Sequence, residues 1–114
     1  MSIGPPFTAT VRHTPAGPVV EAAGELDLDG APILHAALHR ALAIPPASPK
    51  LVIDLAAVTF CDSAGIDALL LARTETDRQG VTLHLGHPTH AVARVLEITG
   101  ADQLIPVDLP HRVD

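Results

Sequence analysis

The sequence predicts a single α/β domain, with helices packed on one mixed sheet of four to five strands. Three observations lead to this prediction. Two strand-like segments open the chain, helical and strand-like segments then alternate, and the links between them are short. The chain has 114 residues, within the usual size of one domain. We expect one domain over residues 1–114, with its core over about 7–107 and a flexible tail over 108–114.

The first two segments predict a β-hairpin. Residues 7–13 alternate between apolar and polar side chains, which is typical of a half-buried strand. Residues 15–18 (PAGP) predict a turn, and residues 19–23 a second strand that pairs with the first.

A loop and a helix follow the hairpin. Residues 24–30 (GELDLDG) are rich in turn formers, and Pro32 suits the first turn of a helix, where its missing N–H costs no hydrogen bond. Pro45, Pro46 and Pro49 are expected to end this helix. Its apolar stripe comprises Ile33, Leu34, Ala37, Leu38, Ala41 and Leu42.

The middle of the chain predicts a central strand and a second helix. Residues 50–55 (KLVIDL) form a short apolar run with β-branched side chains, which favours a parallel strand covered on both faces. Asp62 or Ser63 is a natural N-cap for a helix over residues 64–79, which Gly80 would close.

The last third predicts a strand, a helix and a short edge strand. Residues 81–85 alternate again, and Thr89 suits the N-cap of a helix that ends at Gly100. Residues 104–107 are expected to form an edge strand, because Pro106 cannot donate to a central ladder.

The composition argues against several classes of function. The seven Lys and Arg residues are scattered and the net charge is −6, so we expect no nucleic-acid partner. A single cysteine excludes an internal disulfide and, without a recognisable signal peptide, indicates the cytoplasm. No apolar run approaches the roughly 20 residues that span a bilayer, so no membrane partner is expected.

The segment around Ser63 carries the chemistry. A buried strand delivers this serine to the start of a helix, where unpaired N–H groups and the helix dipole favour a phosphate. Phosphorylation would add about −1.5 to −2 charges beside Asp62 and near Asp67. A partner that packs an apolar or acidic patch there would be repelled. A plain N-capping role for Ser63 is the alternative interpretation.

With these residues in view, the chain resembles the STAS domains, and most closely the bacterial anti-sigma factor antagonists. The likeness spans roughly residues 7–107. The matching segments are GELD at 24–27, LVIDL at 51–55, VTFCDSAG at 58–65 and AVARVLEITGAD at 91–102.

The resemblance implies a switch rather than an enzyme. It implies that an anti-sigma factor with ATP-dependent serine kinase activity phosphorylates Ser63, that the bare form binds this kinase and frees a sigma factor, and that a phosphatase resets the switch. We expect a monomer, with no cofactor of its own. The implied partner-binding residues are Asp27, Asp62, Ser63, Ala64, Gly65, Ile66 and Asp67. Family members often carry a second Ser or Thr where this chain has Ala64, and a small residue where it has Asp67.

Other interpretations are less favoured. Residues 61–65 (CDSAG) resemble the G-x-S-x-G nucleophile elbow, but Cys61 replaces its first glycine. His35 and His39 have the spacing of a zinc pair, yet we expect surface histidines and no metal site. Asp54 suits a loop hydrogen-bond acceptor. Two functional alternatives stay open: a STAS scaffold without phospho-switching, in a stress-sensing or lipid-transport assembly, and a small-anion sensor.

Overall fold

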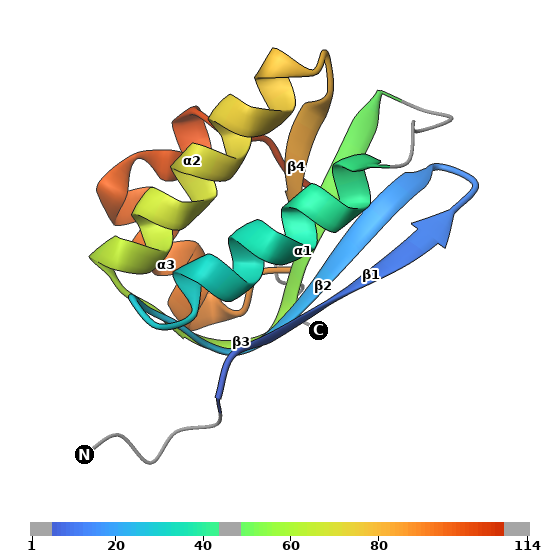
Figure 1. The fold of residues 1–114 in the computed structure, drawn as a ribbon. Helices are drawn as coiled ribbons and strands as arrows, with labels where there is room; N and C mark the ends of the chain where they lie inside the picture. Colours follow the sequence, from blue (N-terminus) through green and yellow to red (C-terminus); the bar gives the residue numbers. More distant parts are fainter. Residues whose placement is uncertain (1–5, 44–48, 109–114) are drawn as a thin grey trace.

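The computed structural model describes residues 6–43 and 49–108, and it has the predicted order of elements (Figure 1). The elements are β1 (Thr8–Thr14), β2 (Gly17–Leu26), α1 (Ala31–Ala43), β3 (Lys50–Cys61), α2 (Ser63–Arg78), β4 (Thr82–Gly86), α3 (His90–Thr99), the 3₁₀ turn η1 (Ala101–Gln103) and β5 (Val107–Asp108). Pro45, Pro46 and the predicted tail beyond Asp108 lie outside the described residues.

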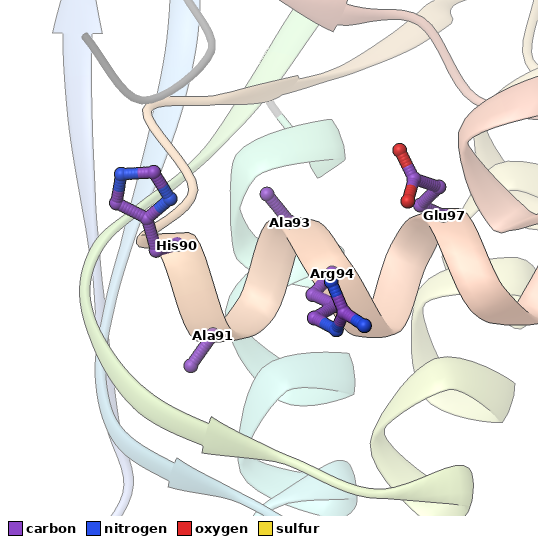
Figure 2. A pocket seen from close by; sticks show the side chains of 5 residues that line it. All are labelled: His90, Ala91, Ala93, Arg94 and Glu97. Atoms are coloured by element: carbon purple, nitrogen blue, oxygen red, sulfur yellow. The ribbon is translucent and has the colours of Figure 1, made fainter. Parts of the chain in front are cut away.

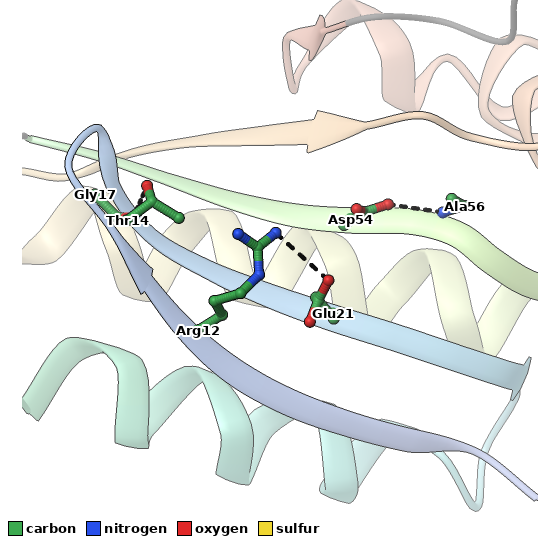
Figure 3. Close-up of polar contacts among 6 residues, drawn as sticks. All are labelled: Arg12, Thr14, Gly17, Glu21, Asp54 and Ala56. Carbon is green, nitrogen blue, oxygen red and sulfur yellow. Dashed lines mark hydrogen bonds and ion pairs between the residues drawn. The ribbon is translucent and has the colours of Figure 1, made fainter.

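The sheet has the strand order β1-β2-β3-β4-β5. The β1–β2 pair is antiparallel, as predicted for the hairpin, and each later pair is parallel. Each parallel connection moves one strand further in the same direction. Because such crossovers are right-handed, they carry the helices to one face of the sheet. In Figure 3, α1 and α2 lie behind the sheet, on the side away from Arg12, Glu21 and Asp54.

The prediction that the central strand is covered on both faces is wrong. Leu51 and Ile53 point to the helices and are fully buried, whereas Val52 and Asp54 between them are only partly buried. β-Branched residues favour a strand but do not report how many of its faces are covered. The helix-free face instead carries polar contacts, such as the pair Arg12–Glu21 at 3.4 Å (Figure 3).

The core is aliphatic apart from Phe7, since the chain has only two Phe and no Tyr or Trp. Its largest fully buried side chains are Leu26, Leu34, Leu38, Leu51, Ile53, Leu55, Leu69, Leu83, Leu85, Leu96, Ile105 and Val20. One member of the predicted α1 stripe differs: Ile33 is 43% exposed. It lies about 100° round the helix from Leu34, at the margin of the buried face.

Two strands run further than predicted. Gly24, which the sequence predicts in a loop, lies inside β2 with φ +93°, and a Cβ there would overlap the carbonyl oxygen of Pro6. β3 continues past Leu55 through a bulge, at which Asp54 Oδ1 accepts a hydrogen bond from the Ala56 N–H at 2.9 Å (Figure 3). A second register shift follows between Gly24 and Glu25 of β2, and the two irregularities let β3 stay paired with β2 as far as Cys61.

The last strand is displaced by one to three residues from its prediction. β5 comprises Val107–Asp108 rather than residues 104–107, and Asp108 therefore belongs to the sheet rather than to a flexible tail. Its carboxylate lies 2.8 Å from Lys50 Nζ and 3.0 Å from His84 Nδ1. The hydrogen bond from Lys50, assisted by His84, lowers the pKa of Asp108 although partial burial opposes the shift.

The start of α2 packs closely against the end of β2. A Cβ on Gly65 would lie 2.3 Å from the Leu26 carbonyl oxygen and 2.8 Å from Cys61 Sγ. The Asp62 N–H also donates to the Leu26 carbonyl, at 3.4 Å. Only glycine permits this approach, which fixes where α2 begins.

We predict that Gly65→Ala destabilises the protein by about 1–3 kcal/mol, because the new methyl group would overlap backbone that cannot move independently. Alanine is the better helix former by about 1 kcal/mol, so without the close contact Gly65→Ala would instead stabilise the protein. Urea denaturation measures the change. A free energy of unfolding equal to or above that of the wild type would contradict the close approach.

We predict that Asp108→Asn lowers stability at neutral pH by less than about 1 kcal/mol, because the Asp108–Lys50 pair is partly exposed. The pKa of Asp108 is lower in the folded protein than its ordinary value of 3.8. Ionised Asp108 therefore stabilises the folded protein fully at pH values above 3.8. The difference from wild type should therefore shrink as the pH falls from 3.8 through the folded value. Denaturation curves measured across this pH range test the prediction. A difference in the free energy of unfolding that grows as the pH falls would contradict it.

Candidate functional site

Ser63 is the first residue of α2, and its side chain is exposed. The N-cap is Asp62, whose Oδ1 accepts a hydrogen bond from the Gly65 N–H at 3.0 Å. No hydrogen bond from another described residue engages the Ser63 hydroxyl. The alternative in which Ser63 is the N-cap is therefore wrong, and its hydroxyl is accessible to a modifying enzyme.

Asp27 makes the same kind of turn before α1. Its Oδ1 accepts from the Gly30 N–H at 2.9 Å, and its carbonyl accepts from the Ala31 N–H at 3.0 Å. β2 and β3 end side by side, because Leu26 pairs with Cys61. The two aspartates that follow these paired residues therefore occupy the same edge of the sheet, as predicted for Asp27.

The two turns share the pattern Asp-x-x-Gly, over residues 27–30 and 62–65. Both glycines are buried, and in both turns the residue after the aspartate is exposed. That residue is Leu28 in the first turn and Ser63 in the second. The first turn thus exposes a leucine and the second exposes a serine, each directly after its aspartate.

Of the other predicted site residues, some are exposed and some are buried. Asp67 is exposed, and Ala64 is partly buried. Gly65 and Ile66 are buried, and the close approach that Gly65 permits is to Leu26 of this chain. The surface around Ser63 therefore comprises the carboxylates of Asp27, Asp62 and Asp67, with no contribution from the Gly65 position.

Cys61, directly before the cap, is buried. Burial, with a smaller contribution from the charge of Asp62, raises the pKa of its thiol to about 11. The thiol is therefore protonated at neutral pH, and the thiolate that nucleophilic chemistry needs is scarce. Its position supports the interpretation of Cys61 as a small apolar residue that ends a strand.

Sequence reasoning missed an apolar groove beside this surface. Its volume is about 270 Å³. The lining residues are Leu28, Ala31, Pro32, His35, Ala68 and Leu71. Leu28 is 74% exposed and Leu71 is 51% exposed. Part of the signal was present in the sequence, since Leu28 stands between two aspartates. Leu71 lies outside the buried face of α2, which comprises Gly65, Ile66, Leu69, Ala72 and Thr76.

A larger hollow of about 400 Å³ lies along α3, lined by His90, Ala91, Ala93, Arg94 and Glu97 (Figure 2). We place no site there, because one helix supplies all its lining residues and it shares none of them with the Ser63 surface. Within residues 6–43 and 49–108, no three His, Cys, Asp or Glu side chains gather as a metal site would require. The rings of His35 and His39 contact each other, with centroids 4.3 Å apart.

None of the helices in the described part of the chain combines the length and hydropathy needed to cross a membrane.

Comparisons with known proteins agree with the fold. The anti-sigma-F factor antagonist RsfA of Mycobacterium tuberculosis is 26% identical over 99 residues, which cover 87% of this chain and 77% of RsfA. The crystal structure of an anti-sigma factor antagonist from Mycobacterium paratuberculosis is 30% identical, with a TM-score of 0.77 over 90% of this chain and 85% of that chain.

A likeness to SpoIIAA, an anti-sigma factor antagonist, bears on the fold alone. Its unphosphorylated form is 19% identical, with a TM-score of 0.70 over 89% of this chain and 88% of that chain. The phosphorylated form of the Bacillus protein has a TM-score of 0.63. Both forms thus share the architecture described above.

The family assignment comes from a sequence match that spans most of the domain. A family model described as "Mlab, STAS domain" matches residues 9–106, from the first strand to the residue before β5. The structure and its likeness to the M. paratuberculosis protein confirm the predicted α/β architecture, and this chain belongs to the STAS domain family.

Proposed function

We propose that this chain is an anti-sigma factor antagonist, and that phosphorylation of Ser63 switches its binding off. The names of the M. tuberculosis and M. paratuberculosis relatives support the antagonism. The observation that carries the switch is the exposed Ser63 hydroxyl at the first position of α2, with the cap supplied by Asp62. In this scheme the chain is a monomeric cytoplasmic binding protein without a cofactor, and its kinase partner holds the ATP.

The folded domain can hold the phosphate. The first N–H groups of a helix lack partners within the helix, and the dipole places about half a positive charge there. Asp62 already satisfies the Gly65 N–H, so a phosphate on Ser63 does not have to replace the cap. Modification and removal by a phosphatase therefore leave the fold in place.

The phosphate changes what the surface can bind. Asp27, Asp62 and Asp67 already make it acidic. Two unit charges about 6 Å apart repel by roughly 3 kcal/mol at an effective dielectric constant near 20, before salt screening. Because about 1.4 kcal/mol changes affinity tenfold, one phosphate is enough to release a partner that packs against Ser63.

We predict that purified anti-sigma factors with serine kinase activity from the source organism, given ATP, add one phosphoryl group to the wild-type chain and none to Ser63→Ala. Thr59→Ala is the matched control, since Thr59 is an exposed hydroxyl close by in sequence, and it should still be modified. Ser63→Ala should bind the partner like the unmodified protein, and Ser63→Asp should bind at least tenfold more weakly. Mass spectrometry and calorimetry provide the measurements.

Two outcomes of that experiment would favour the alternatives. If no phosphoryl group is added and Ser63→Asp binds the same partner as tightly as wild type, the chain is a scaffold. If the isolated chain binds a nucleotide or inorganic phosphate tightly and no anti-sigma factor binds, the surface is a small-anion sensor.

We predict that Asp62→Ala lowers the free energy of unfolding by about 0.5–2 kcal/mol through loss of the cap. Asp62→Asn retains the capping oxygen and should cost less, while removing one charge next to the phosphate. The Asn variant should therefore show a smaller ratio between the affinities of the bare and phosphorylated forms. Equal destabilisation by Ala and Asn would show that the carboxylate charge, not the cap, stabilises α2.

A further inference from the structure

The apolar groove lies on the same surface as Ser63. α1 and α2 pack side by side and begin at the same end of the molecule (Figure 1). Ser63, Asp67 and Leu71 are spaced four residues apart on α2, and all three are exposed. Residues at this spacing follow one helix face in steps of about 6 Å, so the groove begins within about 12 Å of the serine.

The walls of the groove are held in place before any partner arrives. Leu28 sits in the turn closed by the hydrogen bond from the Gly30 N–H to Asp27, and Leu71 sits in the middle of α2. A single exposed leucine on a protein surface is ordinary. Two that line one groove, both more than half exposed, form an apolar patch that a partner can cover at little cost in conformational entropy.

The surroundings define the charge of that partner. Residues 26–39 and 61–72, which include all residues that line the groove, carry Asp27, Asp29, Asp62 and Asp67 and contain no Lys or Arg. The basic residues that follow these segments are engaged elsewhere: Arg40 donates to the Ala9 carbonyl at 3.4 Å, and Arg73 lies 4.0 Å from Asp77. An apolar side chain flanked by basic residues complements this surface. An anionic lipid or a small anion does not, because the same carboxylates repel it.

The size of the groove limits what enters it. Pockets for drug-sized ligands usually measure about 300–1,000 Å³, whereas this groove has about 270 Å³ and is lined by only six residues. That space suits one or two protein side chains. Protein interfaces commonly place a few such anchors in grooves, and these anchors supply most of the affinity.

We propose that the groove between α1 and α2 receives an apolar side chain of the anti-sigma factor, carried on a segment with a neighbouring Lys or Arg. This proposal rests on the proposed function and deepens it by dividing the interface into two parts. The groove supplies affinity and partner choice, and Ser63 supplies the switch.

The test measures affinity of the full chain for the source organism's anti-sigma factor that binds it when Ser63 is bare. Leu71→Ala and Leu28→Ala should each weaken binding at least tenfold while leaving the melting temperature within a few degrees of wild type, since both side chains are exposed. Ile98→Ala is the matched control: it is 72% exposed, lies on α3 and should bind within twofold of wild type. Asp29→Asn should reduce the salt dependence of binding, because one carboxylate that attracts the basic segment is lost.

The outcomes separate this proposal from the one it rests on. If both leucine variants bind like wild type and Ser63→Asp does not, the groove is not the anchor and the switch stands. If no anti-sigma factor binds the wild-type chain, the antagonist function falls and the groove proposal falls with it. Binding of the chain to phosphatidylglycerol vesicles that is lost in Leu71→Ala would replace the protein partner with a lipid surface.

Discussion

The site depends on the pairing of Leu26 with Cys61, where two parallel strands end side by side. Each strand is followed directly by an aspartate: Asp62 caps α2, and Asp27 closes the turn that leads into α1. Gly65 then lets α2 approach the Leu26 backbone more closely than any other residue would allow. These contacts together determine where Ser63 emerges and which residues surround it.

This arrangement separates structural from functional demands on neighbouring residues. Asp62 and Gly65 satisfy the helix terminus and its packing, and Ser63 between them serves neither purpose. A covalent change on the serine therefore acts on the surface charge and not on the fold. The same separation holds in the first turn, where Asp27 and Gly30 shape the backbone and Leu28 is left facing solvent.

Local patterns predicted most of the fold. The alternation in residues 7–13, the apolar stripe after Pro32 and the aspartate before Ser63 each report a structure that depends on neighbours within a few residues. The errors concern long-range arrangement. Gly24 looks like a turn former, but its role depends on Pro6 passing within van der Waals distance. Likewise, the β-branched residues of β3 indicate a strand, but they do not show that helices cover only one face of that strand.

The candidate site shows the same division. The serine, its cap and the nearby Asp27 could be predicted, because helix termini and strand ends follow local rules. The groove itself could not, because the sequence places Leu28 and Leu71 outside the core but does not show that α1 and α2, far apart in the chain, bring them together. The resemblance implies a partner-facing role for Gly65 and Ile66, but both are buried, and Gly65 packs against Leu26, which lies far away in the sequence.

One-sided packing leaves the reverse of the sheet outside both the hydrophobic interior and the Ser63 surface. Thr10 on β1 points into solvent there, next to the Arg12–Glu21 pair. A dye or a resin attached through a cysteine at position 10 would lie on the helix-free face, so the sheet would separate it from the groove. The molecule can thus be immobilised or labelled without obstructing the proposed docking face.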